Sequence, residues 1–193
     1  DGGGLDLREA LALAAGGNKT IGFAAGLSGS TITLGNTYTV AAGTVFDADT
    51  VDTLTISGQT LSLQGAFSVT NGSGDTLTIN SHLADNGTDN SALSSTGAGT
   101  LVLGGTNNTA STGLNSITVS GGTLQVAGDT NLSTGNLTLE NGATLKGTGT
   151  GQHFIDNNIS LGSGGGTIEY ANTGGTDNLR LTGAISGGDL TKT

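Results

Sequence analysis

The chain has 193 residues, enough for one domain with its own core or for several turns of a repetitive fold. Glycine contributes 37 residues and threonine 33, whereas aromatic residues make up 3% of the chain and cysteine is absent. This composition excludes a core of large aromatic side chains, a disulfide framework and a thiolate metal site. Fifteen acidic residues against five basic ones give a net charge of −10, which excludes a protein that grips the phosphates of nucleic acid.

Two features of the whole chain bear on its contact with membranes and on its origin. The longest apolar run falls far short of the roughly 20 residues that span a bilayer, so we expect no membrane contact by this segment. The chain starts at Asp1 and contains no methionine, which suggests a piece of a longer protein. We therefore expect the remainder of the same polypeptide to be one of its partners.

Residues 6–15 predict a short helix. Asp6 is placed as the N-cap, and Glu9 follows three residues later, the spacing of a capping box. One helical face collects the apolar residues Leu7, Ala10, Leu11 and Ala14. The tail of a secretory signal is the alternative, but two charged residues sit badly in its apolar part. We expect residues 1–17 to cap the open end of a core built by residues 18–193.

Short triplets with apolar outer residues and a usually polar centre recur along the chain in two series. The centres of the first series are Thr33, Thr55, Thr78, Val102 and Gln125. The centres of the second series are Thr118, Thr138, Ser160 and Arg180. Both series share a nearly constant period of about 20 to 24 residues, within the range of known repeat architectures. We interpret the two series as one structural unit that repeats.

This alternation is typical of half-buried strands, and the Gly-, Asn- and Ser-rich segments between the triplets are typical of turns. Strands this short cannot bury a face alone, but coils stacked about 4.8 Å apart can. We therefore predict an all-β fold, a right-handed parallel β-helix of about seven or eight coils with an N-terminal capping helix. An antiparallel sandwich or barrel is the competitor, although the strands of a sandwich are usually longer and lack such a period. Asn and Thr at equivalent places are expected to form hydrogen-bonded ladders between coils.

Gly-Thr-Leu-rich segments in the middle of the chain resemble the autotransporter-associated β-strand repeat of bacterial surface proteins. The resemblance is carried by Gly97-Ala-Gly-Thr-Leu-Val-Leu-Gly-Gly-Thr-Asn-Asn-Thr109 and by Ile117-Thr-Val-Ser-Gly-Gly-Thr-Leu-Gln-Val126. Residues 185–193 resemble the opening of a further copy, and Leu7-Arg-Glu-Ala-Leu11 is similar to segments that open β-helices of large secreted bacterial proteins. The resemblance implies the exported stalk of a surface-displayed protein, often an adhesin, and it carries no catalytic motif.

Acidic residues supply the first candidate chemistry. Asp47, Asp49 and Asp52 cluster in one short segment, and oxygen-rich clusters bind calcium or serve carbohydrate lyases on β-helices. A lyase also needs a basic residue, and none of the five bases lies near this cluster in sequence. Residues 71–77 and 174–179 each match part of a calcium-binding nonapeptide, and neither match is complete. We interpret all these segments as solvated turns, with a lyase-like enzyme and a calcium-binding module as the alternatives.

Two further candidates are histidines and threonines. His82 and His153 each stand beside an apolar residue, and we interpret them as turn or strand-end residues rather than as metal ligands or a catalytic base. A flat threonine array of the kind that some ice-binding solenoids use is a third hypothesis, although this array stops by Val102. Its members are Thr31, Thr33, Thr53, Thr55, Thr76 and Thr78.

These observations favour a structural function. We expect a β-helical stalk that spaces or presents an adhesive region of a secreted protein or of one anchored at the bacterial outer membrane. We expect no enzymatic activity, no catalytic residues, no cofactor and no bound metal. The expected partners are host or neighbouring-cell surface molecules or glycans, together with end-to-end self-association through an open C-terminal coil.

Overall fold

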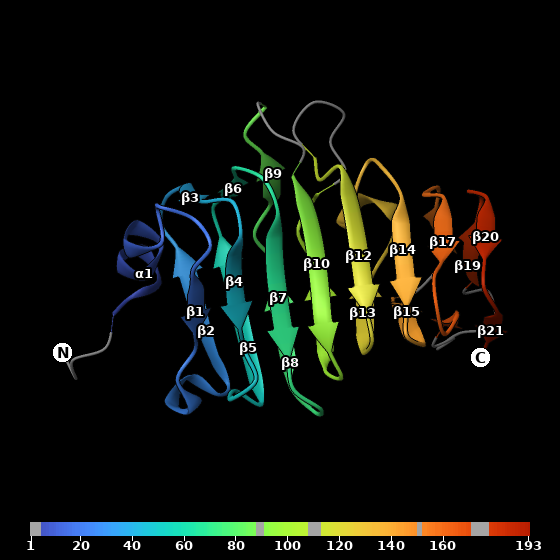
Figure 1. The fold of residues 1–193 in the computed structure, drawn as a ribbon, viewed down its shortest axis with the longest axis horizontal. Coiled ribbons are helices and arrows are strands. Elements are labelled where there is room, and N and C mark those ends of the chain that lie inside the picture. The colour runs from blue at the N-terminus through green and yellow to red at the C-terminus, as the bar shows by residue number, and fades with distance from the viewer. Residues whose placement is uncertain (1–4, 88–90, 108–112, 150–151, 171–177) are drawn as a thin grey trace.

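The computed structural model describes residues 5–87, 91–107, 113–149, 152–170 and 178–193. These residues form a parallel β-solenoid of about seven turns, with a single short α-helix near the N-terminus (Figure 1). The predicted all-β stacked-coil architecture is therefore confirmed. Each turn contributes one strand to each of two eight-stranded sheets, so the two series of triplets are indeed two sides of one repeating unit.

Four sheets run along the solenoid, and every strand pair in the described residues is parallel. Sheet A contains β1 (Thr20–Gly22), β4 (Thr44–Asp47), β7 (Phe67–Asn71), β10 (Ala92–Gly97), β12 (Ser116–Ser120), β14 (Leu137–Glu140), β17 (Ile159–Leu161) and β20 (Ile185–Gly187). Sheet B contains β2 (Ser30–Leu34), β5 (Thr53–Gly58), β8 (Thr76–Ile79), β11 (Thr100–Leu103), β13 (Thr123–Val126), β15 (Ala143–Gly147), β18 (Gly166–Tyr170) and β21 (Leu190–Lys192).

Two smaller sheets are separate from sheets A and B. Sheet C contains β3 (Tyr38–Val40), β6 (Leu61–Leu63) and β9 (Leu83–Asp85), and sheet D contains β16 (Gln152–Ile155) and β19 (Asn178–Leu181). Short 3-10 helices occupy Ala25–Leu27 and Asp129–Asn131. The smaller sheets therefore each span only two or three turns, whereas sheets A and B span the whole rod.

The core is built from rows of aliphatic side chains that stack in register from turn to turn. The central row of sheet B consists of Leu54, Leu77, Leu101, Leu124, Leu145 and Ile168, all of them buried. Each member covers its neighbour at the spacing of adjacent strands, about 4.8 Å. Burying one such side chain contributes roughly 1.5–3 kcal/mol, so the row stabilises the rod by repetition.

The first turns add an aromatic stack to this core. Phe23, Phe46 and Phe67 are buried, and their rings meet edge to face with centroid distances of 5.5 and 4.8 Å. Such edge-to-face pairs contribute roughly 0.5–1.5 kcal/mol beyond the burial of their area. Three of the four phenylalanines therefore lie in the core of the N-terminal half of the rod.

The predicted helix is confirmed as α1 (Leu7–Leu13), with its capping box. Oδ1 of Asp6 accepts a hydrogen bond from the Glu9 backbone N–H at 2.7 Å, and the Glu9 carboxylate accepts one from the Asp6 N–H at 3.1 Å. Leu7, Leu11 and Ala14 are buried and belong to the core cluster. The helix therefore packs its apolar face onto the first turn, as the sequence predicts.

The predicted register is right in the middle of the rod and wrong at two places. The centres 55, 78, 102 and 125 pair in sheet B, and the centres 118, 138 and 160 pair in sheet A. Thr33, however, pairs with Ser57, and Thr31 is the partner of Thr55. This shift to the next equivalent position keeps each side chain on its predicted side of the sheet, because strand side chains alternate with a period of two.

The second error concerns Arg180. The partner of Ser160 in sheet A is Ser186, whereas Arg180 lies in β19 of sheet D opposite Phe154. The turn between Ser160 and Ser186 is longer than the turn between Thr118 and Thr138, so an assumption of constant turn length selects the wrong strand. An apolar–polar–apolar triplet marks any half-buried strand and does not identify its sheet.

The alternation in β14 leads to a prediction about stability. Leu139 is fully buried between Val119 and Leu161, while Thr138 faces outward between Thr118 and Ser160. Leu139→Asp should abolish folding or lower the free energy of unfolding by several kcal/mol, because it buries an unpaired carboxylate. Thr138→Asp should cost less than about 1 kcal/mol. Denaturant unfolding of both variants checks this, and equal losses would contradict the alternating model.

Candidate functional site

The three aspartates of the acidic segment lie in a turn between β4 and β5. Asp47 ends β4, and its Oδ1 accepts a hydrogen bond from the Asp49 backbone N–H at 3.1 Å. Asp52 accepts one from the Ser28 hydroxyl at 3.2 Å. These bonds shape the local backbone and engage one carboxylate oxygen each of Asp47 and Asp52.

Electrostatics in this turn is repulsive. Partial burial, followed by the nearby charges of Asp47 and Asp75, raises the pKa of Asp49 above its ordinary value. Within the described ranges, no group of three or more acidic or histidine side chains is arranged to hold a metal ion. The arrangement is that of neighbouring carboxylates on successive turns rather than that of a cation site.

The partial nonapeptide at residues 71–77 also forms a turn. The Asn71 side chain is buried, and its amide donates a hydrogen bond to the Thr100 backbone carbonyl at 3.0 Å in the next turn. Asp75 donates its backbone N–H to the carbonyl of Gly72 at 3.1 Å. Residues 174–177 of the second partial nonapeptide lie outside the described residues. Asn71 thus links turns through the backbone.

The acidic turn yields a prediction about calcium. We expect millimolar calcium or a chelator to change the midpoint of thermal unfolding by less than about 3 °C, which corresponds to roughly 1 kcal/mol for a domain of this size. Asp49→Asn should leave the midpoint unchanged or raise it, because it removes a repelled charge. A calcium-dependent rise that disappears in Asp49→Asn would mean that this aspartate is a ligand.

His82 and His153 lie in different parts of the rod and do not form one site. His82 precedes β9 and is half-buried, and its Nε2 atom is buried without a hydrogen-bond partner among the described residues. Burial lowers the pKa of His82 below its ordinary value of 6.5. His153 lies in β16, with its ring centroid 6.2 Å from that of Tyr170.

The lowered pKa of His82 predicts a specific dependence of stability on pH. The unfolded chain binds a proton at this histidine more readily than the folded chain, so stability is retained above pH 6.5 and is lost as the pH falls from there through the folded pKa. His82→Gln should therefore lose less stability than the native chain between about pH 7.5 and pH 5. Urea unfolding at both pH values measures this, and an unchanged pH dependence in the variant would count against it.

Asp85, which the sequence does not single out, is a carboxylate with several hydrogen-bond donors around it. Its oxygens accept hydrogen bonds from the backbone N–H groups of Gly87 and Ser91 and from the Asn115 side chain, at 2.8, 3.1 and 2.8 Å. Burial acts to raise the pKa of Asp85, but these hydrogen bonds together outweigh it and hold the pKa below its ordinary value. Asp85 therefore ties successive turns together, with both of its oxygens engaged.

Threonines form a longer outward row than the sequence analysis expects. The row on sheet B consists of Thr53, Thr76, Thr100, Thr123, Thr144, Thr167 and Thr191, which are register partners on seven successive strands. The neighbouring outward row begins with Thr31, Thr55 and Thr78 but continues with Val102, Gln125, Lys146 and Glu169. The double array therefore ends where the sequence predicts, and a single row of hydroxyls continues.

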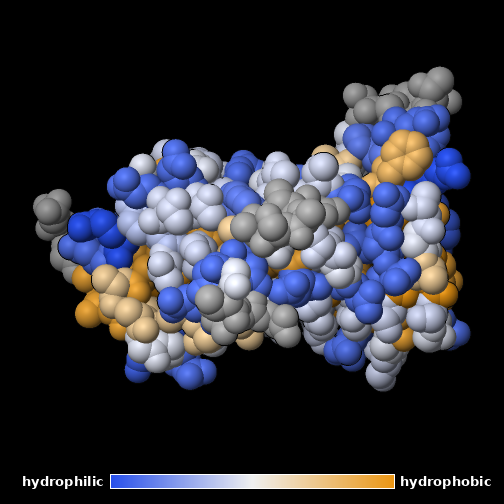
Figure 2. Space-filling view, turned by 90° about the horizontal axis from the view of Figure 1, so that it is seen from above, coloured by the Kyte–Doolittle hydropathy of each residue, from blue (hydrophilic) through white to orange (hydrophobic). Residues whose placement is uncertain are grey.

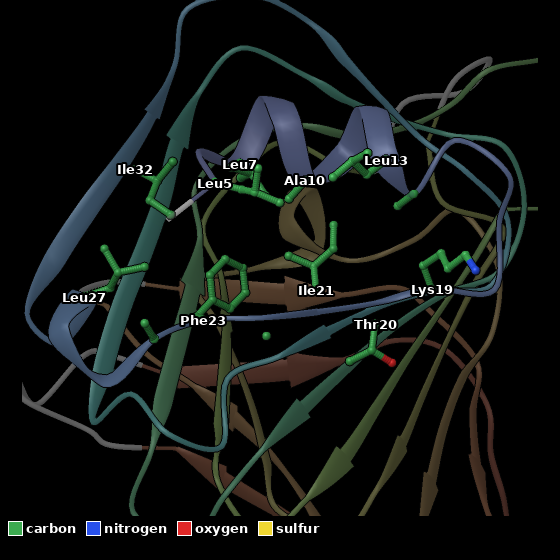
Figure 3. Close-up of a pocket in the computed structure, with 13 residues that line it drawn as sticks. Leu5, Leu7, Ala10, Leu13, Lys19, Thr20, Ile21, Phe23, Leu27 and Ile32 are labelled. Carbon is green, nitrogen blue, oxygen red and sulfur yellow. The ribbon is translucent and has the colours of Figure 1, made fainter. Parts of the chain in front are cut away.

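A cavity of about 460 Å³ lies beneath α1 at the N-terminal end of the rod. Ile21, Phe23, Leu27 and Ile32 line it from the first turn, and Leu5 and Leu13 border it from the helix side (Figure 3). Leu5 and Leu13 are 62% and 69% exposed. Hydrophobic surface is accordingly visible at the α1 end of the molecule (Figure 2). The helix thus covers part of the first turn and leaves an apolar hollow beside it.

Comparisons with protein-family models, curated proteins and solved structures give no match for this chain. Within the described residues, no helix has the length and apolarity needed to cross a membrane. The fold therefore defines the chain as a parallel β-solenoid, and its functional class has to be inferred from the residues themselves.

Proposed function

We propose that this chain is a structural β-solenoid stalk of a secreted or surface-displayed bacterial protein, and that it spaces or presents an adhesive region. The observation that carries the proposal is the continuous core. Buried side chains form one cluster from Leu7 in α1 to Ile168 in β18. A single core of this kind makes the turns one rigid body whose length is set by the number of turns.

The geometry of sheets A and B supports a spacer role. Each further turn adds one strand to both sheets and advances the rod by about 4.8 Å. The outward rows consist largely of hydroxyl side chains, and only 10% of all residues are charged. Such a surface gives a rod of defined length with few strong contacts along its sides.

The location at a bacterial surface rests on the sequence resemblance, whose Gly-Thr-Leu elements can be placed in the fold. The Gly-Thr-Leu element of residues 99–101 leads into β11, and the Gly-Gly-Thr-Leu element of residues 121–124 leads into β13. These strands are neighbours in sheet B. The two Gly-Thr-Leu elements of the resembling segment are thus one turn of the rod apart.

The proposal assigns no catalytic role to the acidic segment. The ion pairs of the described residues join Arg8 to Asp6 and Glu9, and Lys146 to Glu169. None of them involves the aspartates between β4 and β5. A lyase-like mechanism requires a base beside its carboxylates, and no ion pair of the described residues joins a basic side chain to these aspartates.

Deleting one whole turn tests the stalk proposal. Removal of residues 123–143 joins Gly122 to Thr144, the register partner of Thr123, and places β12 beside β17. The shortened chain should fold and should lose about 4.8 Å of length, measured by small-angle scattering. When the shortened chain is placed between a cell-surface anchor and a terminal peptide epitope, antibodies should reach the epitope less well than with the native chain. A duplicated turn should make the epitope more accessible.

A deletion of half a turn is the matched control. Removing residues 123–133 breaks the register of both sheets and should prevent folding. The stalk proposal fails if the whole-turn deletion folds but epitope access does not follow the number of turns. It also fails if the native chain cleaves pectin or alginate and this cleavage disappears in Asp47→Asn.

A further inference from the structure

The outward face of sheet D carries an aromatic ring and a cation side by side. Strands β16 and β19 are in register, so that Gln152 lies opposite Asn178 and Phe154 lies opposite Arg180. All four residues are exposed, while Ile155 is buried on the other side of the strand. Two amides, a phenyl ring and a guanidinium therefore occupy adjacent positions on one small surface.

Phe154 is the exposed phenylalanine of the chain. The other three are buried in the aromatic stack of the first turns, whereas Phe154 is 41% exposed. A single exposed apolar residue is ordinary on a protein surface. Here, however, the Arg180 guanidinium carbon lies 5.9 Å from the centroid of the ring, within the range of a cation–π contact. The ring thus positions a cation beside an accessible flat apolar surface.

The charge of Arg180 is not neutralised by a carboxylate in the described part of the chain. Arg8 and Lys146 each form ion pairs, and Arg180 forms none with the residues that the structure describes. Asp156, which follows β16, accepts a hydrogen bond from the Thr182 hydroxyl instead. A guanidinium carries five N–H donors in a planar fork that matches a carboxylate, and it stays charged at any physiological pH.

We propose that the outward face of sheet D binds an acidic glycan through a uronic acid residue. The apolar face of the sugar ring rests on Phe154, the sugar carboxylate accepts hydrogen bonds from Arg180, and the sugar hydroxyls meet the amides of Gln152 and Asn178. Ligand sites combine aromatic side chains with a small number of polar groups that fix the orientation of the ligand. This inference goes beyond the stalk role and does not depend on it.

The net charge of −10 sets the conditions for such binding. It repels a polyanion at long range, but interactions beyond about 8 Å are largely screened at physiological ionic strength. Close contact with Arg180 is much less screened. Binding therefore requires the local pairing of carboxylate and guanidinium, and a general attraction to anions is excluded by the sign of the net charge.

Isothermal titration calorimetry of the full chain with galacturonate oligomers tests the proposal. Methyl-esterified oligomers, galacturonate monomer and polyglutamate are the comparison ligands. We expect the acidic oligomer to bind at least about tenfold more tightly than each of these, because a bidentate charge-assisted pair and ring stacking act together. Arg180→Gln and Phe154→Leu should each weaken binding at least about tenfold.

Lys19→Gln is the matched control, because it removes one positive charge from an exposed residue near the opposite end of the rod. It should bind like the native chain, and thermal unfolding should show that all three variants remain folded. The proposal is overturned if the acidic oligomer does not bind, if Arg180→Gln binds normally, or if Lys19→Gln weakens binding equally. Equal binding of the methyl-esterified oligomer or of polyglutamate also overturns it. The whole-turn deletion tests the stalk separately, since its readout is the length of the rod and the deletion retains every residue of β16 and β19.

Discussion

Register between turns is the constraint on which the rest of the structure depends. The strands have three to six residues, too few to bury a face alone, so each interior side chain must lie on the equivalent side chain of the next turn. The rows through Leu101 and Leu139 satisfy this condition over most of the rod. A slip of one residue would exchange the inward and outward side chains of a strand, so the core does not tolerate register errors. The core does not depend on which residues occupy the outward positions.

Side-chain amides let the turns bend and vary in length without losing this register. Asn107 accepts a hydrogen bond from the Leu83 N–H and donates one to the carbonyl of Asn131, and Asn131 donates to the carbonyl of Gly105. Asn157 likewise donates to the carbonyl of Ser133. The expected asparagine ladder therefore exists in a modified form, because the amides bond to the backbone of neighbouring turns. Backbone groups that leave the strands at the bends are satisfied in this way.

Sequence patterns predict the parts of this fold that repeat and miss the parts that do not. The helix from Leu7 follows from a local cap, and the middle of both sheets follows from alternation and a nearly constant period. The same reasoning assigns Arg180 to sheet A, because a triplet encodes only alternation, while the partner of a strand depends on the length of the preceding turn. Sequence patterns miss the full threonine row for a related reason. The members of this row stand just before the triplets, so the triplet pattern does not include them. The row extends past the strand of Val102 because Thr100 pairs with a threonine on each neighbouring strand.

The number of turns over which a sheet must match also explains where residues for ligand recognition can occur. Sheets A and B must match across every turn, which favours one residue type in a buried row such as the leucine row, whereas the outward row from Thr55 to Glu169 carries several types. Sheets C and D match over two or three turns only, so their outward positions can carry residues that occur once. Phe154 and Arg180 occupy such positions, and neither has an equivalent on the regular faces. A solenoid can therefore acquire a recognition surface at an irregular turn without disturbing the register that stabilises the rod, since Ile155 still points into the core and is fully buried.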